Sequence, residues 1–282
     1  MLLTFYPAER KVCGMKVAER VVVVTGASMG IGEAIVHRFL QEGASVVLAS
    51  RDLSRLEAAR ERTAAPERTL AVACDVTVRA QVEALLRATL ERFGRVDVWI
   101  NNAGFGLIDS VERMDMSACH RIFETNLFGA IECMQVIAPV FKRQKSGAII
   151  NISSVAGMVS VPYGAAYAAT KHALNCISRA ARLEMAAHNV QVNCVCPGYV
   201  RTEFSANAVW GNDKMRVRGA KQRGITAERV AQAVWKTYKD NRRLVIVPWS
   251  NKLLVFFYRL LPGLFDWGMV KMLRRMSRDG KA

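Results

Sequence analysis

A tyrosine and a lysine four residues apart, Tyr167 and Lys171, are the side chains of this 282-residue chain best placed to exchange a proton. On a helix this spacing puts both on one face, where the ammonium can favour the ionised phenol. An isolated tyrosine loses its proton only near pH ~10, so proton exchange at neutral pH needs such a neighbouring charge. Ser154, upstream of the pair, adds a hydroxyl that can hold the same substrate oxygen. The alternative is that Tyr167 and Lys171 merely share a solvated helix face.

A second signal lies near the N-terminus, where valines 21–24 lead into a glycine-rich turn and then a helical pattern. Strand, tight turn and helix in that order build an anion site, because free N–H groups and the helix dipole point at a phosphate. The spacing is Gly-x3-Gly-x-Gly, which differs from the commonest dinucleotide fingerprint. The predicted cofactor contacts of this turn are Thr25, Gly26, Ser28, Met29, Gly30, Ile31 and Gly32.

The elements that must position these residues alternate between strand and helix patterns along the chain. Apolar runs predict strands at 21–25, 45–49, 69–74, 96–100, 148–152, 190–196 and 244–247. Apolar residues at three- and four-residue steps predict helices near 32–41, 53–63, 79–93, 117–142, 165–187 and 227–238. This alternation predicts a single doubly wound, Rossmann-type α/β domain with a seven-stranded parallel sheet. In such a sheet, ligands bind at the carboxyl ends of the strands.

Composition is consistent with one large domain of this kind, since 51% of the residues are hydrophobic. The seven cysteines form no Cys-x-x-Cys pair, which predicts small core residues of a reduced, cytoplasmic compartment. The four histidines show no metal-ligand spacing, so we predict no metal site.

Two further segments, Asn101-Asn102-Ala103-Gly104 and Pro197-Gly198-Tyr199-Val200-Arg201-Thr202, accompany these signals. Together, the four motifs and Asn126 resemble the short-chain dehydrogenase/reductase family over about residues 19 to 247. The resemblance implies hydride transfer between a nicotinamide cofactor and a substrate carbon. It also implies that Asn126 holds a water connecting Lys171 to solvent. The catalytic residues that it implies are Asn126, Ser154, Tyr167 and Lys171.

The end of the second predicted strand indicates which cofactor is bound. An acidic side chain there would bind the ribose hydroxyls, whereas arginine can pair with a 2′-phosphate. Here Ser50 is followed by Arg51, which predicts NADP(H). The alternative is that Arg51 is a surface residue and Asp52 only the N-cap of the next helix.

Other cofactor contacts are expected at the ends of later strands. Asp75 can accept from the adenine amino group while Val76 lines the base, although Asp75 could equally be a helix N-cap. By resemblance, Asn102, Ala103 and Gly104 run beside the adenosine end of the cofactor and brace the sheet. The predicted nicotinamide contacts are Pro197, Gly198, Val200 and Thr202, together with Tyr167 and Lys171.

The substrate is expected to contact Ser154, Tyr167 and Tyr199, beneath a variable loop at 203–224. The pocket is predicted to be apolar because of Met158, Val159, Tyr163, Tyr199, Phe204 and Trp210. We therefore expect a lipophilic ketone or secondary alcohol. Two alternatives are a reductase of carrier-tethered 3-oxoacyl groups, which the basic segment 214–223 permits, and a cofactor-binding protein without turnover.

Charge and packing patterns bear on partners. The net charge of +16 is concentrated in residues 201–282, but no nucleic-acid recognition motif accompanies it, so we predict no nucleic-acid partner. The end of the long helix around Glu184 and Met185 is expected to pack on another subunit or helix, which predicts a homodimer or homotetramer.

The sequence predicts a leader at 1–18, a catalytic domain at 19–248 and an amphipathic basic extension at 249–282. Translation could begin at Met1 or Met15. In the extension we expect two short helices broken at Pro262-Gly263, with no run long enough to cross a bilayer. Basic residues and Trp249, Tyr258 and Trp267 suggest peripheral attachment to an anionic membrane. The alternative is that these helices cap the substrate pocket or pack on a neighbouring subunit.

Overall fold

The computed structural model describes residues 19–211 and 224–278, so the predicted leader and the 212–223 part of the substrate loop lie outside the described residues. Seven parallel strands form one sheet in the order β3-β2-β1-β4-β6-β7-β9, which confirms the predicted doubly wound sheet. The strands are β1 (Val21–Thr25), β2 (Ser45–Ser50), β3 (Thr69–Ala73), β4 (Val98–Asn101), β6 (Gly147–Ile152), β7 (Val190–Pro197) and β9 (Leu244–Val247). The strand order reverses between β1 and β4, which is where such sheets bind ligands.

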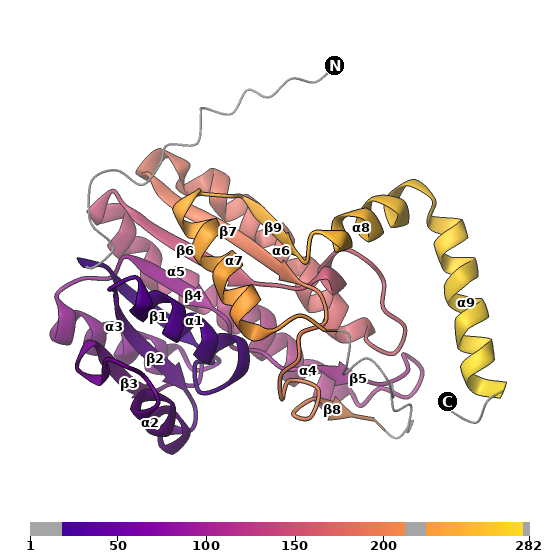
Figure 1. Cartoon of the computed structure of the whole chain (residues 1–282), viewed down its shortest axis with the longest axis horizontal. Coiled ribbons are helices and arrows are strands. Elements are labelled where there is room, and N and C mark those ends of the chain that lie inside the picture. Colours follow the sequence, from indigo (N-terminus) through magenta and orange to yellow (C-terminus); the bar gives the residue numbers. More distant parts are fainter. Residues whose placement is uncertain (1–18, 212–223, 279–282) are drawn as a thin grey trace.

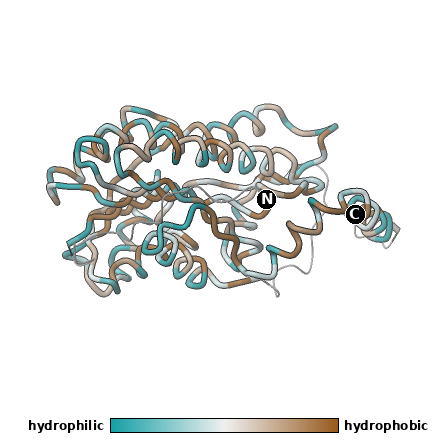
Figure 2. Tube along the Cα trace, turned by 90° about the horizontal axis from the view of Figure 1, so that it is seen from above, coloured by the Kyte–Doolittle hydropathy of each residue, from teal (hydrophilic) through white to brown (hydrophobic). Residues whose placement is uncertain are grey.

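Helices cover both faces of the sheet, and Figure 2 shows the strands as a central layer between two helical layers. One face is covered by α1 (Gly30–Gln41), α2 (Leu53–Glu61) and α7 (Ala227–Lys239). The other is covered by α3 (Arg79–Phe93), α5 (Gly129–Gln144) and α6 (Ala165–Met185). This burial of both faces explains why the strands are runs of apolar residues rather than alternating patterns.

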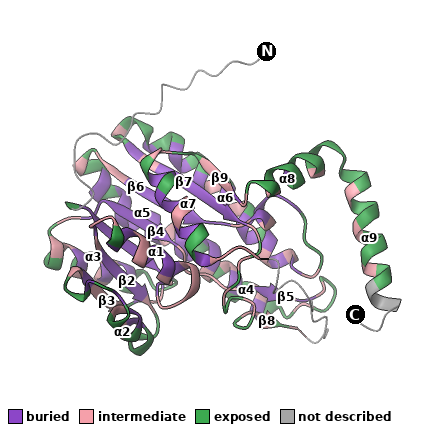
Figure 3. Ribbon diagram, in the orientation of Figure 1, coloured by how far each residue is buried: buried purple, intermediate pink, exposed green. Residues whose placement is uncertain are grey.

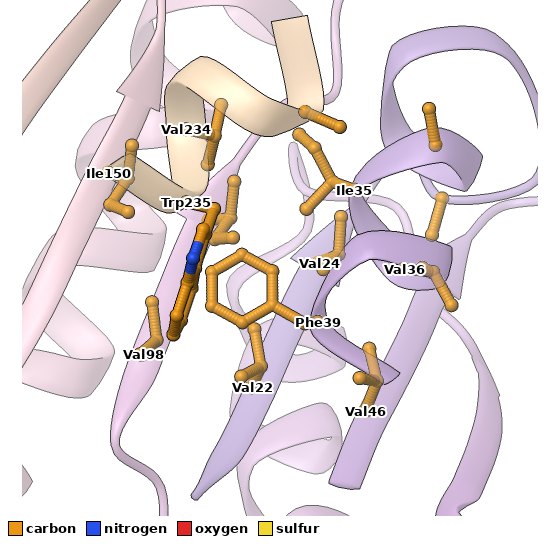
Figure 4. Packing of buried hydrophobic residues seen from close by; sticks show 14 of the residues in the cluster. Val22, Val24, Ile35, Val36, Phe39, Val46, Val98, Ile150, Val234 and Trp235 are labelled. Atoms are coloured by element: carbon orange, nitrogen blue, oxygen red, sulfur yellow. The ribbon is translucent and has the colours of Figure 1, made fainter. Parts of the chain in front are cut away.

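The core beneath α1 and α7 is built on aromatic packing. Phe39 is fully buried and its ring lies edge-on to Trp235, with centroids 5.5 Å apart (Figure 4). Val22 and Val98, from neighbouring strands, lie below these two rings. Such edge-to-face pairs add to the stabilisation that comes from area burial alone.

The helix predicted over 117–142 is interrupted. The structure has α4 (Met116–Phe123), a π-helical turn over Glu124–Phe128, and then α5. The buried Asn126 side chain lies in the turn and is bonded to the backbone of Phe105, far away in sequence. A π-turn inserts without breaking the helical run of apolar residues, so the sequence pattern does not reveal it.

A second, two-stranded sheet was not predicted. It pairs β5 (Leu107–Ile108) with β8 (Val209–Trp210) beside α4 (Figure 1). These strands have two residues each and lie far apart in the chain, so neither gives a periodic signal. The pairing ties the start of the predicted substrate loop to the segment that follows β4.

Another subunit or another helix was expected to cover Met185, and the structure shows that residues of its own chain cover it. Met185 is buried in its own chain, in the core between α6 and the sheet. Leu183, two residues earlier, is the exposed apolar residue at this end of α6. The homodimer or homotetramer stays a prediction.

Two helices follow the sheet: α8 (Ser250–Leu260) and α9 (Pro262–Arg278). They confirm the predicted helical extension, although Pro262 begins α9 instead of forming a separate turn, because proline is tolerated at the first helical position. Figure 3 shows α8 leaving the body of the molecule and α9 standing apart from it, both largely exposed. Among the described residues, no single helix is long and apolar enough to cross a membrane. The pair α8 and Pro262–Arg275 has the length and composition together, but it is bent by 109°.

Candidate active site

The glycine turn forms an anion-binding cradle at the end of β1. Gly30 has a φ of 60°, which L side chains rarely adopt. A Cβ on Gly32 would lie 2.1 Å from the Gly26 carbonyl oxygen, so only glycine allows the turn to close on itself. Met29 is the N-cap of α1, and no side chain of the described residues caps this helix. The N–H groups of its first turn are therefore free to bind a phosphate, and the cradle fits a dinucleotide.

Asn102 and Thr25 hold this cradle against the end of β4. The Thr25 hydroxyl accepts from the backbone N–H groups of Asn102 and Ala103, at 3.0 and 3.1 Å. The Asn102 amide donates to the Thr25 and Gly26 carbonyl oxygens, at 3.0 and 2.9 Å. In the structure, Asn102 thus supports the turn, in keeping with the bracing role that the resemblance implies.

Ser154, Tyr167 and Lys171 come together where β6 ends. Lys171 is buried on α6, and its Nζ donates to the carbonyl oxygen of Ile152, 2.9 Å away. The Ser154 hydroxyl accepts from Ala156 N at 3.1 Å and lies 3.4 Å from the Pro197 carbonyl oxygen, to which it donates. The structure therefore places the predicted proton donor, hydroxyl and ammonium at one point of the sheet edge, on two adjoining elements.

Burial controls the protonation of this group. It raises the pKa of the Tyr167 phenol to about 12, and a hydrogen bond with Ser154 partly opposes the rise. Burial also lowers the pKa of the Lys171 ammonium to about 8. That Lys171 eases ionisation of the phenol during the reaction stays a prediction. Lys171 Nζ lies 5.8 Å from the centre of the Tyr167 ring, and desolvation of the phenol dominates. At neutral pH Tyr167 holds its proton and can donate it.

Asn126 lies close to Lys171, although the two are 45 positions apart and the local sequence pattern does not require this. Its Oδ1 accepts from Phe105 N at 3.0 Å, and its Nδ2 donates to Phe105 O at 2.9 Å. A Cβ on Gly104 would lie 2.9 Å from Asn126 Oδ1 and 3.7 Å from Lys171 Nζ, so the three residues converge. The role of Phe105 as the backbone anchor of Asn126 was missed, and nothing in the sequence signals it.

The end of β2 presents Ser50 and Arg51. Arg51 is exposed and makes no hydrogen bond or ion pair with the residues that the structure describes, so its guanidinium is free to bind an anion. Asp52 is the N-cap of α2 and accepts from Arg55 N at 3.0 Å. The capping role suggested for Asp52 is thus confirmed, whereas Arg51 stays a candidate for the 2′-phosphate.

Asp75 does not cap the helix that follows it. The N-cap of α3 is Val78, and Asp75 instead accepts from the backbone N–H and the hydroxyl of Thr77, at 2.9 and 2.8 Å. The N-cap alternative is therefore wrong, because the chain makes an Asx turn before α3 begins. Val76 is buried and packs on Gly129, where a Cβ would lie 2.6 Å from its side chain.

The segment after β7 reaches back to the glycine turn. A Cβ on Gly30 would lie 3.4 Å from the Thr202 side chain, so the predicted nicotinamide and phosphate contacts are neighbours. Val200 forms an isolated bridge with Ile225, which holds this segment where the described chain resumes. Asn207 donates to the Met29 sulfur at 3.3 Å, a second link between these loops that the sequence does not reveal.

The predicted pocket residues are not all gathered around Tyr167. Phe204 lies against the catalytic candidate, with its ring centroid 5.7 Å from that of Tyr167. Met158 and Val159 are buried and pack on Val255 of α8 instead. Tyr199 is partly exposed and faces Gly224.

Comparisons with known proteins identify the family of the chain. The family model for short chain dehydrogenase matches residues 20–212. An uncharacterized oxidoreductase of Staphylococcus epidermidis is 34% identical over 219 residues, covering 78% of this chain and 90% of that protein. Mouse dehydrogenase/reductase SDR family member 7B is 32% identical over 271 residues, covering 92% of this chain and 83% of that protein. The match with the mouse protein covers 92% of this 282-residue chain, which is more than 248 residues. The alignment therefore includes part of the C-terminal extension.

Solved structures show the same fold. A short chain dehydrogenase/reductase of Burkholderia phymatum, crystallised in complex with NAD, superposes with a TM-score of 0.83 at 25% identity, covering 89% of this chain and 96% of that one. A 3-ketoacyl-(acyl-carrier-protein) reductase of Brucella melitensis, complexed with NADH, gives a TM-score of 0.73 at 26% identity, covering 81% and 96%.

The fold, the glycine turn and the Tyr–Lys pair together define a Rossmann-type oxidoreductase that uses a nicotinamide cofactor. The chain belongs to the short-chain dehydrogenase/reductase family. This confirms the predicted family and the broad activity, that of an enzyme acting on CH–OH groups.

Proposed function

We propose that this chain is an NADP(H)-dependent oxidoreductase that interconverts a ketone and a secondary alcohol on a lipophilic substrate. The observation that carries the proposal is the meeting of Ser154, Tyr167 and Lys171 at the end of β6, next to the Thr202 segment and the glycine turn. Proton donor and cofactor cradle share one edge of the sheet.

The nicotinamide cofactor supplies the hydride for ketone reduction, and the chain must then protonate the substrate oxygen. Tyr167 donates that proton, since burial keeps its phenol protonated at neutral pH. The Ser154 hydroxyl holds the same oxygen. Lys171 is positively charged at neutral pH and stabilises the phenolate that forms when the proton leaves. For alcohol oxidation the phenolate takes the proton back.

The residues proposed to hold the cofactor are those of the cradle, the ends of β2 and β4, and the turn after β7. Arg51 favours NADP(H), because a free guanidinium beside the Ser50 hydroxyl can pair with a 2′-phosphate. The two related structures named above contain NAD or NADH, so the choice of cofactor is a point that measurement must decide.

Apolar and aromatic residues near the phenol support a lipophilic substrate. Phe204 lies over Tyr167, and Phe105 and Leu107 belong to the apolar cluster beneath it. The structural similarity to a 3-ketoacyl-(acyl-carrier-protein) reductase favours 3-oxoacyl groups as a second candidate substrate class. The basic segment 214–223, which suggested that class from the sequence, lies outside the described residues.

A substrate screen tests the proposal. Purified protein is incubated with apolar ketones, secondary alcohols and 3-oxoacyl thioesters, each with NADPH or NADP⁺ and with NADH or NAD⁺, and cofactor absorbance is followed. We expect turnover of an apolar ketone with NADPH and little with NADH. Turnover of thioesters alone would favour the carrier-linked class. Cofactor binding without turnover of any compound would favour the protein that binds cofactor without catalysis.

A further inference from the structure

Helices α8 and α9 present large apolar side chains to solvent. Trp249, Phe256, Leu260, Leu264 and Trp267 are between 57% and 64% exposed. Elsewhere in the described chain, large exposed apolar residues are scattered over separate elements, such as Val111 and Leu183. Such a concentration of exposed apolar side chains marks a site of interaction, because isolated apolar residues are ordinary on a protein surface but clusters are not.

The same helices are basic. Their exposed charged side chains are Lys252, Arg259, Asp266, Lys271, Arg274 and Arg275, of which only Asp266 is acidic. Lys271 Nζ lies 4.9 Å from the centre of the Trp267 ring, so an ammonium borders the apolar surface. An indole next to a cation is the arrangement that suits the boundary between lipid headgroups and acyl chains.

The bend between the helices bears on whether they span a bilayer or lie in its interface. Together they have the length and composition of a span, but they are bent by 109° where Leu261 separates them. Among the described residues, neither helix alone is long and apolar enough to cross a hydrocarbon core. Lying in the interfacial plane, two short amphipathic helices can bury apolar side chains while their basic groups stay with the headgroups.

The side of α8 that faces the domain packs on the segment that follows Ser154. Val255 is buried against Val155 and Met158, just after Ser154. Tyr258 OH and Ser160 Oγ are 2.9 Å apart and hydrogen-bonded, and the Tyr258 ring lies edge-on to Phe265 of α9, with centroids 4.9 Å apart. A surface that holds α8 would therefore lie close to the loop that follows Ser154.

We infer that α8 and α9 form an interfacial docking element for anionic phospholipid bilayers. A second copy of this chain is the less suitable occupant, since a symmetric contact would bring the basic residues of both copies together with only Asp266 to offset them. The inference does not depend on the cofactor or on turnover, and a chain inactive in every substrate assay would leave it intact.

Vesicle sedimentation tests the docking element. Full-length protein is mixed at low salt with phosphatidylcholine vesicles, with or without phosphatidylserine, and pelleted. We expect binding to the anionic vesicles, weaker binding to the neutral ones, and loss of the difference at high salt. Replacing Arg274 and Arg275 by alanine should weaken anionic binding by about 30-fold, taking ~1 kcal/mol for each basic residue.

A second variant tests the contribution of the exposed apolar side chains of α8 and α9 to vesicle binding. Phe256→Ser with Trp267→Ser should weaken binding to both kinds of vesicle by at least about tenfold for each side chain. Matched controls are Met116→Ser with Leu183→Ser, which removes exposed apolar residues elsewhere, and Lys142→Ala with Arg143→Ala, which removes two exposed basic residues from α5. Both controls should bind as the unaltered protein does, and circular dichroism checks that every variant is folded.

The inference is overturned if the unaltered protein stays in the supernatant with anionic vesicles at low salt, or if the α8–α9 variants bind no more weakly than the controls. Sedimentation equilibrium without lipid gives a further outcome. A dimer that Phe256→Ser with Trp267→Ser converts to monomer, in a protein that does not pellet with vesicles, would show that a second copy covers these helices.

Discussion

Two phenylalanines summarise the contrast between the sheet domain and the C-terminal helices. Phe39 on α1 is fully buried against Trp235, whereas Phe256 on α8 is 57% exposed. Both lie on amphipathic helices, but the apolar face of α1 covers the sheet and that of α8 faces away from the body. The contrast teaches that the same residue type stabilises the fold in one region and is available for an external contact in the other.

Within α8, some side chains pack on the domain and others are exposed to solvent. Val255 is buried and Tyr258 is hydrogen-bonded to Ser160, while Phe256 and Phe257 on the other side are more than half exposed. One face of α8 therefore completes the support of the active-site loop, and the remaining faces contribute little to the stability of the domain. Matched substitutions, each pairing one residue type in the two regions, can separate these roles.

The largest expected effect is on kcat/KM, for which substitutions of two tyrosines should differ strongly. Tyr167→Phe removes the proton donor, so kcat/KM for the substrate found in the screen should fall by ~10²–10⁴-fold while NADPH still binds. Tyr258→Phe removes only the hydroxyl that bonds to Ser160 and should change kcat/KM by less than about tenfold. Steady-state kinetics and cofactor titration measure both. Turnover of Tyr167→Phe at the unaltered rate would refute the proposed chemistry.

The two phenylalanines themselves should differ almost as much in stability. Phe39→Ala leaves a cavity in a packed core and is expected to lower the free energy of unfolding by about 3–5 kcal/mol. Phe256→Ala should change it by no more than ~0.5 kcal/mol, because that side chain is mostly solvated. Urea unfolding followed by circular dichroism gives both values. A large loss for Phe256→Ala would mean that α8 packs on the domain more fully than the structure shows.

Substitutions of two arginines test whether the protein prefers NADP⁺ to NAD⁺. A charge-assisted bond worth ~1.5–3 kcal/mol to the 2′-phosphate means that Arg51→Ala should weaken NADP⁺ binding by roughly 10- to 150-fold and leave NAD⁺ binding nearly unchanged. Arg259→Ala on α8 should affect neither cofactor. Isothermal titration calorimetry with both cofactors distinguishes the outcomes. Equal losses for NAD⁺ and NADP⁺ would show that Arg51 is structural.

The smallest expected effect is a difference between two lysines in how the free energy of unfolding depends on pH. Burial lowers the pKa of Lys171 from 10.5 to about 8, so between these values the unfolded chain binds more protons at this residue than the folded chain does. The free energy of unfolding therefore gains a contribution that rises with pH, by at most ~1.4 kcal/mol per pH unit. Lys171→Met should lose that rise between pH 8 and 10.

Lys271→Met is the matched control, since Lys271 is exposed on α9. Urea unfolding of both variants and the unaltered protein is repeated across the pH range. A pH profile for Lys171→Met parallel to that of the unaltered protein would show that Lys171 is not buried as the structure has it. Subtracting the profiles removes the contribution of the other titrating groups.

Much of the fold was predictable because its signals are local. Valines 21–24, the glycines that follow and the Tyr167–Lys171 spacing each depend on neighbours in the chain, and the strands lie where apolar runs predict them. The α8–α9 pair was predictable for the same reason, from a periodic apolar pattern interrupted by proline.

Features that depend on distant contacts were not predictable. The π-turn at Asn126 is bonded to Phe105, the β5–β8 pair joins segments from two ends of the domain, and Met185 turns inward to its own core. The sequence suggested Asp75 as an acceptor for adenine or as a helix N-cap, and it did not predict the Asx turn that precedes the N-cap of α3 at Val78.

The sequence by itself determined which residues could do chemistry, the order of strands and helices, and the apolar and basic character of the C-terminal extension. These depend on residue type and on spacing along the chain. Only the tertiary structure decided that burial raises the pKa of Tyr167 while lowering that of Lys171, because desolvation depends on which segments cover a group. It also decided that Val255 of α8 faces inward and Phe256 outward, because the direction of a helix face is set by what the helix packs against.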